Sequence, residues 1–179
     1  GGTVYRDGGR MIDTYGCTAI INAGTAGGMD EKLQIFDIVI STETAYHDVA
    51  EDILTDFHPW LDSIYFRADE GLLRAGKKAA EDTWGKYRVM FGRMITGEEF
   101  IEDHKREQIC GKYEPLCVDM ETAAIAHVCH VNGTPFISVR SITDTPEHRG
   151  IEEFERNCES ASRISADFVR RMLREYDKV

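Results

Sequence analysis

Residues 118–144, VDMETAAIAHVCHVNGTPFISVRSITD, carry the pattern that decides the fold. A short apolar strand at the start of this stretch leads into 121–131, where apolar residues recur at helical spacing. Gly133 is typical of a helix stop, and the β-branched run at 134–142 predicts a buried strand. The order strand, helix, strand predicts an α/β domain.

The rest of the chain extends the same alternation. Apolar, partly β-branched runs predict three more strands, and helical spacing predicts two more helices, the last of them long and amphipathic. The predicted strands are 18–22, 35–40 and 87–95, and the predicted helices are 69–83 and 151–176. We therefore expect one domain over residues 1–179, a three-layer αβα sandwich with a central mixed sheet.

The composition and net charge of the chain limit the kinds of molecule that we expect it to bind. Of the 179 residues, 42% are hydrophobic and 30% are charged, which is an ordinary balance for a globular protein. The formal net charge of −11 disfavours nucleic acid and anionic membranes as partners, but it allows a small substrate of low charge. No apolar run approaches the roughly 20 residues of a membrane span, and the polar, glycine-rich start is no signal peptide.

The cysteines predict a reducing compartment. The five cysteines are odd in number and scattered, without a CxxC pair or zinc-finger spacing. We therefore expect free thiols in a cytoplasmic protein, since disulfide frameworks belong to oxidising compartments.

A glycine-rich segment, residues 22–28 (NAGTAGG), follows the first predicted strand. Its three glycines allow the backbone to approach a ligand closely and to expose N–H groups. The spacing fits neither a Walker A loop nor GxGxxG. Both a purely structural turn and a ligand-binding turn therefore remain open.

Three acidic positions and one basic position stand out in and beside the central helix and the strand that follows it. Asp119 or Glu121 is placed either to cap the helix or to accept hydrogen bonds from a ribose. Arg140 lies within an apolar strand, and a buried guanidinium needs a carboxylate partner, which either acid could supply. Asp144 ends the same strand, the usual place for ligand groups in α/β sheets, although an Asp before Pro146 is also ordinary turn chemistry.

Three weaker signals favour structural roles. Adjacent residues in Tyr46-His47-Asp48 diverge on an extended chain, so a catalytic His-Asp pair is disfavoured. His127 and His130 have metal-ligand spacing on a helix, but no third ligand is near in sequence, and we predict no metal. The pair 100–101 (Phe-Ile) fits either the core or an aromatic platform for a base.

Taken together, the motifs resemble a known family. They are IINAGTAGG (20–28), DIVISTE (37–43), YHD (46–48), ITGEEFI (95–101), VDMETAAIAHVC (118–129) and VRSITD (139–144). In order and spacing they resemble the methylthioadenosine/S-adenosylhomocysteine nucleosidase branch of the nucleoside phosphorylase family. The resemblance covers roughly residues 17–175, and the 118–129 motif is its most specific part.

The resemblance implies an activity and an architecture. It implies a phosphorylase/hydrolase-like αβα fold, a homodimer, and hydrolysis of a nucleoside at its N-glycosidic bond, with water as nucleophile and no cofactor or metal. Cleavage places positive character on the sugar and negative charge on the purine, so the base must be protonated as it leaves. The resemblance gives this general-acid role to Asp144, whose pKa must be raised by a water-excluding site.

The resemblance also implies a set of substrate contacts. Glu121 and Met120 would hold the ribose, and Arg140 would hold Glu121 in place. The backbone around Ile101 would read the edge of the adenine, and the Phe100 ring would stack on it. The remaining predicted contacts are Thr25, Ala26 and Gly27 beside the sugar and the water, together with Asp119 and Thr143.

The sequence departs from the family pattern, and three competing functions stay open. Before residue 17, the family's opening strand and its water-activating glutamate have no counterpart, and we expect the sequence to be part of a longer chain. Residues 49–67 do not resemble the segment that lines the 5′ pocket, so the 5′ substituent stays open. A phosphate-dependent phosphorylase, another nucleoside hydrolase and a non-catalytic nucleoside-binding homologue are the competing functions.

Overall fold

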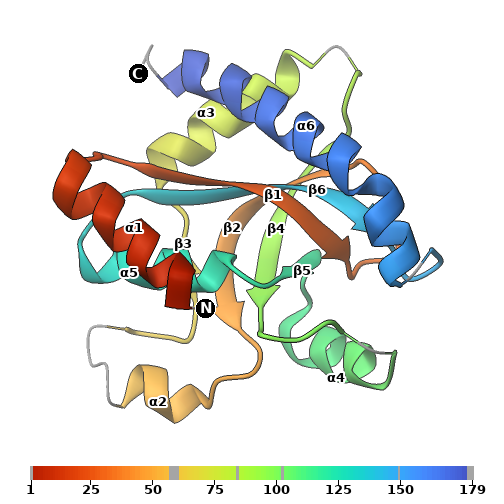
Figure 1. The fold of residues 1–179 in the computed structure, drawn as a ribbon, viewed down its shortest axis with the longest axis horizontal. Coiled ribbons are helices and arrows are strands. Elements are labelled where there is room, and N and C mark those ends of the chain that lie inside the picture. The colour runs from red at the N-terminus through yellow and green to blue at the C-terminus, as the bar shows by residue number, and fades with distance from the viewer. Residues whose placement is uncertain (1, 57–60, 84, 102, 149, 177–179) are drawn as a thin grey trace.

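A computed structural model describes residues 2–56, 61–83, 85–101, 103–148 and 150–176. Strands and helices alternate along most of this chain (Figure 1). The helices are α1 (Gly2–Tyr15), α2 (Glu51–Thr55), α3 (Glu70–Glu81), α4 (Asp103–Tyr113), α5 (Thr122–Val131) and α6 (Ile151–Tyr176). The strands are β1 (Ile20–Gly28), β2 (Ile38–Tyr46), β3 (Phe66–Arg67), β4 (Val89–Thr96), β5 (Cys117–Asp119) and β6 (Phe136–Asp144).

The strands form one mixed sheet in the order β3-β2-β4-β5-β1-β6. The pairs β1–β6, β2–β4 and β4–β5 are parallel, and β1–β5 and β2–β3 are antiparallel. A further antiparallel pairing joins β2 to β6, so the sheet curls and closes on itself. The prediction of a central mixed sheet is confirmed, and the closure is a feature that sequence periodicity does not reveal.

Helices cover the sheet on both sides (Figure 1). On one side α3 and α6 pack on each other and on the sheet, around buried Ile40, Leu72 and Phe168. On the other side α5 packs on the sheet with α1 beside it, and its Ala123 and Cys129 join a second apolar cluster. These layers agree with the predicted three-layer αβα architecture.

Two predicted helices are confirmed with nearly the expected bounds. In α3, Asp69 caps the first turn by accepting a hydrogen bond from the Leu72 amide at 2.9 Å. In α6, the apolar stripe buries Ala161, Phe168 and Met172 against the sheet layer.

The predicted strand 18–22 and its glycine turn were wrong in extent. β1 continues through the glycines to Gly28, because β6 pairs with it along almost its whole length, with a shift in register after Ala26. The predicted strand 35–40 begins later, at Ile38, after Phe36 with its left-handed φ of 72°. It then runs on through polar residues to Tyr46, where pairing with β4 sets the strand's extent.

Four short or polar elements were not predicted: α1, α2, β3 and α4. α1 and α4 contain glycines, and α4 also lacks a clear apolar stripe.

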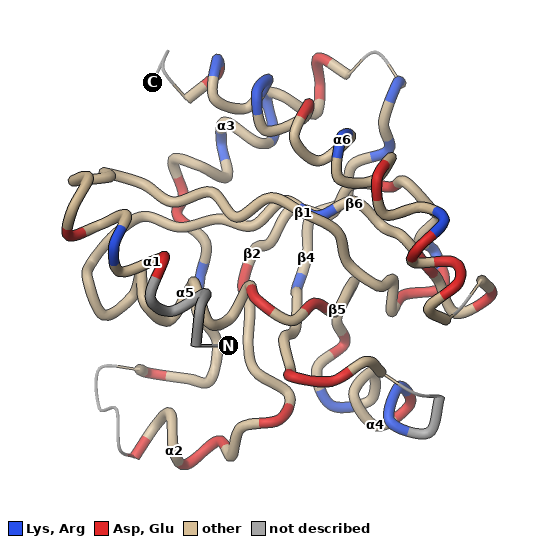
Figure 2. Tube along the Cα trace, in the orientation of Figure 1, with Lys and Arg blue, Asp and Glu red and all other residues tan. Residues whose placement is uncertain are grey.

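Charge, thiols and helix length bear on the remaining predictions. Figure 2 shows acidic residues gathered around α2 and along the first half of α6, and basic residues on α3 and α6. Each of the five cysteines is a free thiol, and burial raises the pKa of Cys129 to about 12. Among the described residues, no helix is both long enough and apolar enough to cross a membrane.

Candidate active site

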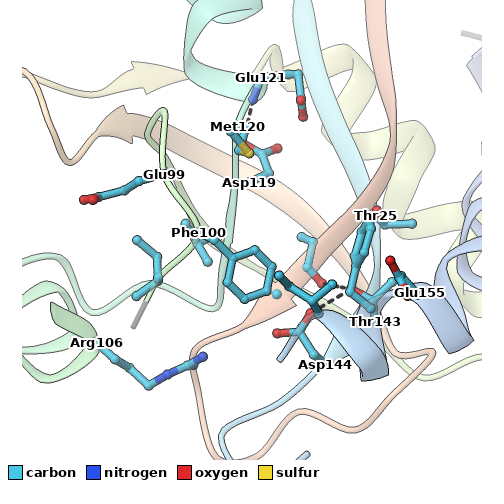
Figure 3. A pocket seen from close by; sticks show the side chains of 16 residues that line it. Thr25, Glu99, Phe100, Arg106, Asp119, Met120, Glu121, Thr143, Asp144 and Glu155 are labelled. Atoms are coloured by element: carbon cyan, nitrogen blue, oxygen red, sulfur yellow. Dashed lines mark hydrogen bonds between the residues drawn. The ribbon is translucent and has the colours of Figure 1, made fainter. Parts of the chain in front are cut away.

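A cavity of about 350 Å³ opens where β1, β5 and β6 meet the loop after β4 and the first turn of α6. Ten of the predicted site residues line it: Thr25, Ala26, Gly27, Phe100, Ile101, Asp119, Met120, Glu121, Thr143 and Asp144 (Figure 3). Arg140, predicted to support them, lies directly behind the wall that Asp119 and Glu121 form. The fold thus brings together residues that are up to 119 positions apart in the chain.

Asp144 ends β6 at the floor of the cavity and is only 4% exposed. The Thr143 hydroxyl lies 2.8 Å from its Oδ1 and 3.2 Å from the Ala26 carbonyl oxygen. Burial raises the pKa of Asp144, and this outweighs the opposing effects of the Thr143 hydrogen bond and the Arg106 charge. The negative charge of Glu153 acts in the same direction as burial. A carboxyl group in this setting is suited to hold a proton and then donate it.

The absence of a side chain at Gly27 of β1 leaves room for the carboxyl group of Asp144. The strand register pairs Gly27 with Asp144, and a Cβ at Gly27 would stand 3.1 Å from the Asp144 Oδ2. Any larger residue would push against the carboxyl group or fill the cavity. The glycine-rich segment is therefore strand backbone that leaves room for an acid and a ligand.

Asp119 is buried and its carboxylate is fully engaged by the protein. Its Oδ2 lies 2.6 Å from the Arg140 Nη2, and its Oδ1 accepts from the Thr96 hydroxyl at 2.7 Å. Oδ1 also accepts from the Thr122 amide at 3.1 Å, so Asp119 caps the start of α5. Of the two acids considered for the cap, the structure selects Asp119.

Glu121 stands at the N-cap position of α5 without making a side-chain cap, and its side chain is 43% exposed. One oxygen lies 3.4 Å from the Arg140 Nη2, and the residue lines the cavity. Arg140 therefore serves both acids, with Asp119 as its closer partner. Carboxylate oxygen remains available at the cavity for a hydroxyl-bearing ligand.

Arg140 is 4% exposed, and the space for it is made by another glycine. A Cβ at Gly24 would collide with the Arg140 Nη1, so the parallel neighbour in β1 must be glycine. The prediction that Arg140 is buried and needs a carboxylate partner is confirmed.

The loop after β4 carries Phe100, whose ring is 49% exposed at the cavity, and the buried Ile101. Asp48 holds this loop by accepting from the Glu98 amide at 2.8 Å. The His47 ring packs on Gly97, where a Cβ would collide with it, and its burial lowers the pKa of His47. The Tyr46-His47-Asp48 segment thus has the structural role that its sequence favoured.

Among the described residues, no group of three or more His, Cys, Asp or Glu side chains is placed to hold a metal ion. The rings of His127 and His130 instead lie near Phe66, with centroids 5.0 and 5.8 Å away.

Several cavity residues were not singled out from the sequence. Val118 continues β5 into the cavity wall, while Glu99 and Arg106 lie on the side of α4. The first turn of α6 adds Ile151, Phe154 and Glu155. Phe154 falls within the amphipathic helix predicted over 151–176, which marked it as a packing residue, and Arg106 carried no local signal because α4 was not predicted.

Comparisons with known proteins identify the family of the chain. Residues 3–174 match the Phosphorylase superfamily. The 5′-methylthioadenosine/S-adenosylhomocysteine nucleosidase of Geobacillus thermodenitrificans is 38% identical over 168 residues, which are 91% of this chain and 70% of that protein. The nucleosidase of the same name from Actinobacillus succinogenes is 39% identical over 171 residues, 93% of this chain and 74% of that one.

Solved structures give the same relationship. The Neisseria meningitidis nucleosidase in complex with methylthio-immucillin-A has a TM-score of 0.86 and 30% identity, covering 96% of this chain and 76% of that chain. The Colwellia psychrerythraea nucleosidase in complex with adenine has the same TM-score and identity, covering 98% and 74%. The futalosine hydrolase of Helicobacter pylori has a TM-score of 0.84 at 25% identity, covering 96% and 74%. The chain belongs to the Phosphorylase superfamily and, within it, to the family of 5′-methylthioadenosine/S-adenosylhomocysteine nucleosidases.

Proposed function

We propose that this protein hydrolyses the N-glycosidic bond of 5′-methylthioadenosine or S-adenosylhomocysteine and releases adenine. The observation that carries the proposal is Asp144, a buried carboxyl group with a raised pKa at the floor of a nucleoside-sized cavity. The names of the related nucleosidases supply the substrate class.

In the proposed reaction, the bond between C1′ of the ribose and N9 of the purine breaks with both electrons moving to the base. Asp144 gives its proton to N7, so adenine leaves as a neutral molecule. A water oxygen bonds to C1′ on the opposite face and the water gives up one proton to solvent, from which Asp144 is reprotonated once adenine has left. Thr25, Ala26 and Gly27 line the cavity beside Asp144, and we assign them to the side of the sugar and the water.

The base and the ribose are assigned to different walls of the cavity. The exposed face of Phe100 offers a stacking surface for adenine, and the adjacent backbone at Ile101 offers hydrogen-bonding groups. Glu121 would accept hydrogen bonds from the ribose hydroxyls, with Met120 packed beside the sugar. Asp119, whose oxygens are engaged by Arg140 and Thr96, fits a supporting role better than direct contact with substrate.

The charges of the cavity support water over phosphate as the nucleophile. Among the described residues that line it, Arg106 is the one base, and four are acids besides Asp144, the proton donor of the proposed reaction. Arg140 is already paired with two carboxylates. A phosphate ion would meet net repulsion there, whereas water and a neutral nucleoside would not.

The test measures the release of adenine from 5′-methylthioadenosine by the full-length protein, with and without inorganic phosphate. Release that is independent of phosphate is expected. Release that requires phosphate would transfer the protein to the phosphorylases. No release of adenine from this substrate or from S-adenosylhomocysteine would favour a nucleoside-binding homologue.

A second expected result concerns the ribose. Glu121→Gln should lower kcat/KM by about ten- to a hundredfold, because hydrogen bonds to a charged acceptor are worth about 1.5–3 kcal/mol. The variant should also discriminate less between the natural substrate and its 2′- or 3′-deoxy analogues. Steady-state kinetics on the three substrates measures both effects, and equal wild-type activity on all three would contradict the assignment.

The assembly and location are also part of the proposal. Phe100, Met120 and Ile151 are large apolar side chains at the cavity, and they are 49%, 41% and 61% exposed. A second copy of the chain would cover such a surface, in line with the homodimer implied by the family resemblance. Five free thiols fit a reducing compartment, and we place the protein in the cytoplasm.

A further inference from the structure

α4 brings Arg106 to the end of the cavity that holds Asp144. The Arg106 Nη1 donates to the Gly28 carbonyl oxygen at 2.6 Å and lies 3.3 Å from the Met29 sulfur. The β1 backbone next to it lies beside Asp144: the strand register pairs Gly27 with Asp144, and a Cβ at Gly28 would stand 3.1 Å from the Asp144 main-chain carbonyl oxygen. Figure 3 shows the Arg106 side chain pointing toward Asp144 from the opposite side of the cavity.

These contacts leave part of the hydrogen-bonding capacity of the Arg106 guanidinium unsatisfied. Its Nε is buried and has no hydrogen-bond partner among the described residues. No ion pair links Arg106 to a carboxylate within the part of the chain that the structure describes. Arg106 lines the cavity and is held there by a backbone carbonyl oxygen, so its positive charge is fixed beside whatever binds in the cavity.

We propose that Arg106 is a positioning residue for the departure of the base. The positive charge of Arg106 stabilises the negative charge that bond cleavage creates at the Asp144 end of the cavity. The inference rests on the proposed nucleosidase function. The charge balance of that reaction explains the need. As the C1′–N9 bond breaks, two electrons pass to the purine, and the proton moves from Asp144 to N7. Adenine leaves neutral and Asp144 remains as a carboxylate.

One extra negative charge therefore appears at this end of the cavity, first on the base and then on Asp144. A fixed cation nearby favours both states over the uncharged starting state. The same cation lowers the pKa of Asp144 against the larger effect of burial, which keeps the acid able to give up its proton.

The other charged groups near Asp144 do not supply this effect. Glu153 of α6 acts in the opposite direction by raising the pKa of Asp144. Glu155 of α6 and Glu99 of the loop after β4 also line the cavity as acids, and Lys105 is paired with Glu99. At the opposite wall, Arg140 is held by Asp119 and Glu121.

The experiment compares Arg106→Gln, Arg106→Lys and the control Lys112→Gln in the full-length protein. Lys112 lies on the same helix, where it is exposed and paired with Glu51 at 2.9 Å, so this variant makes the same change in charge away from the cavity. We expect kcat for adenine release to fall about tenfold in Arg106→Gln, less than the roughly hundred- to thousandfold loss typical of a donor that contacts the developing charge directly. Arg106→Lys should recover part of the loss, and Lys112→Gln should match the wild type.

The pH profile separates this role from a structural one. Catalysis needs protonated Asp144, and loss of the Arg106 charge should raise the pKa of Asp144 further. The basic limb of the kcat–pH profile should therefore move to higher pH in Arg106→Gln and stay near its original position in Arg106→Lys. A variant that merely loosens α4 would lose thermal stability without moving this limb.

A wild-type kcat and an unmoved basic limb in Arg106→Gln would overturn the inference. If that variant does not fold, Arg106→Met, which keeps the aliphatic stem, replaces it with the same expectations. Failure of both to fold would assign Arg106 to the packing of α4 and would also overturn it. Failure of the wild type to release adenine would instead contradict the proposed function itself.

Discussion

Asp144→Asn is expected to lower kcat for adenine release by at least about a hundredfold, while the protein remains folded. The substitution keeps the size of the side chain and an oxygen that can accept from Thr143, but it removes the proton that leaves with the base. A hundredfold loss corresponds to about 2.7 kcal/mol of transition-state stabilisation. The measurement is the rate of adenine release at saturating 5′-methylthioadenosine.

The same substitution should raise the stability of the protein near neutral pH. Burial raises the pKa of Asp144 in the folded state, so the folded protein holds a proton that the unfolded chain releases. The folded state therefore loses stability as the pH rises from the unfolded pKa through the folded pKa of this group. An asparagine has no charge to bury, so Asp144→Asn should melt at a higher temperature than the wild type at pH 7.

A matched control removes a carboxylate from the surface. Asp167→Asn on α6 loses a partly exposed acid that bonds Tyr87 and Lys86, far from the catalytic chemistry, and should keep wild-type kcat. A variant of Asp144 that turns over at close to the wild-type rate would remove the general acid from the mechanism. A variant that is both inactive and less stable would point to a packing role instead.

The fold could be predicted where local pattern and tertiary structure agree. α6 carries an apolar stripe along its length, and β6 contains the apolar, β-branched run that predicted a strand, so each was recognised from its own sequence. α1 and α4 were not predicted, because both contain glycines and α4 lacks a clear apolar stripe. The closure of the sheet through β2 and β6 depends on strand pairing over about a hundred residues, which periodicity does not encode.

The site was more predictable than some of the elements that carry it. Asp144 stands at a strand end, where ligand-binding groups are common in α/β sheets. Arg140 lies in a buried strand, where its charge needs a carboxylate partner, so both positions already pointed to a functional site. The glycines of β1 were interpreted as a turn, since nothing local shows that Gly24 makes room for Arg140 or that Gly27 makes room for Asp144. Arg106 was missed for the same reason, because only the fold brings α4 to the cavity.

Arg140→Met is expected to lower the free energy of unfolding by about 3–5 kcal/mol, the cost of leaving a buried charge without its partner. Asp119 is buried, and its Oδ2 lies 2.6 Å from the guanidinium, so Arg140→Met leaves this carboxylate without its cation. Thr96 and the start of α5 depend on the same carboxylate, and the disturbance should reach the cavity wall that carries Glu121. Since domains of this kind are stable by about 5–15 kcal/mol, the loss is a large fraction of the total.

A double-mutant cycle shows whether the pair itself causes the loss. Asp119→Asn alone removes one charge and leaves Arg140 with Glu121, 3.4 Å away, so it should cost less than Arg140→Met. Combining Arg140→Met with Asp119→Asn removes both buried charges, and the double variant should be more stable than Arg140→Met alone. Urea unfolding of the four proteins measures the coupling. Additive losses, or a cost below about 1 kcal/mol for Arg140→Met, would mean that the buried pair does not hold this wall of the cavity together.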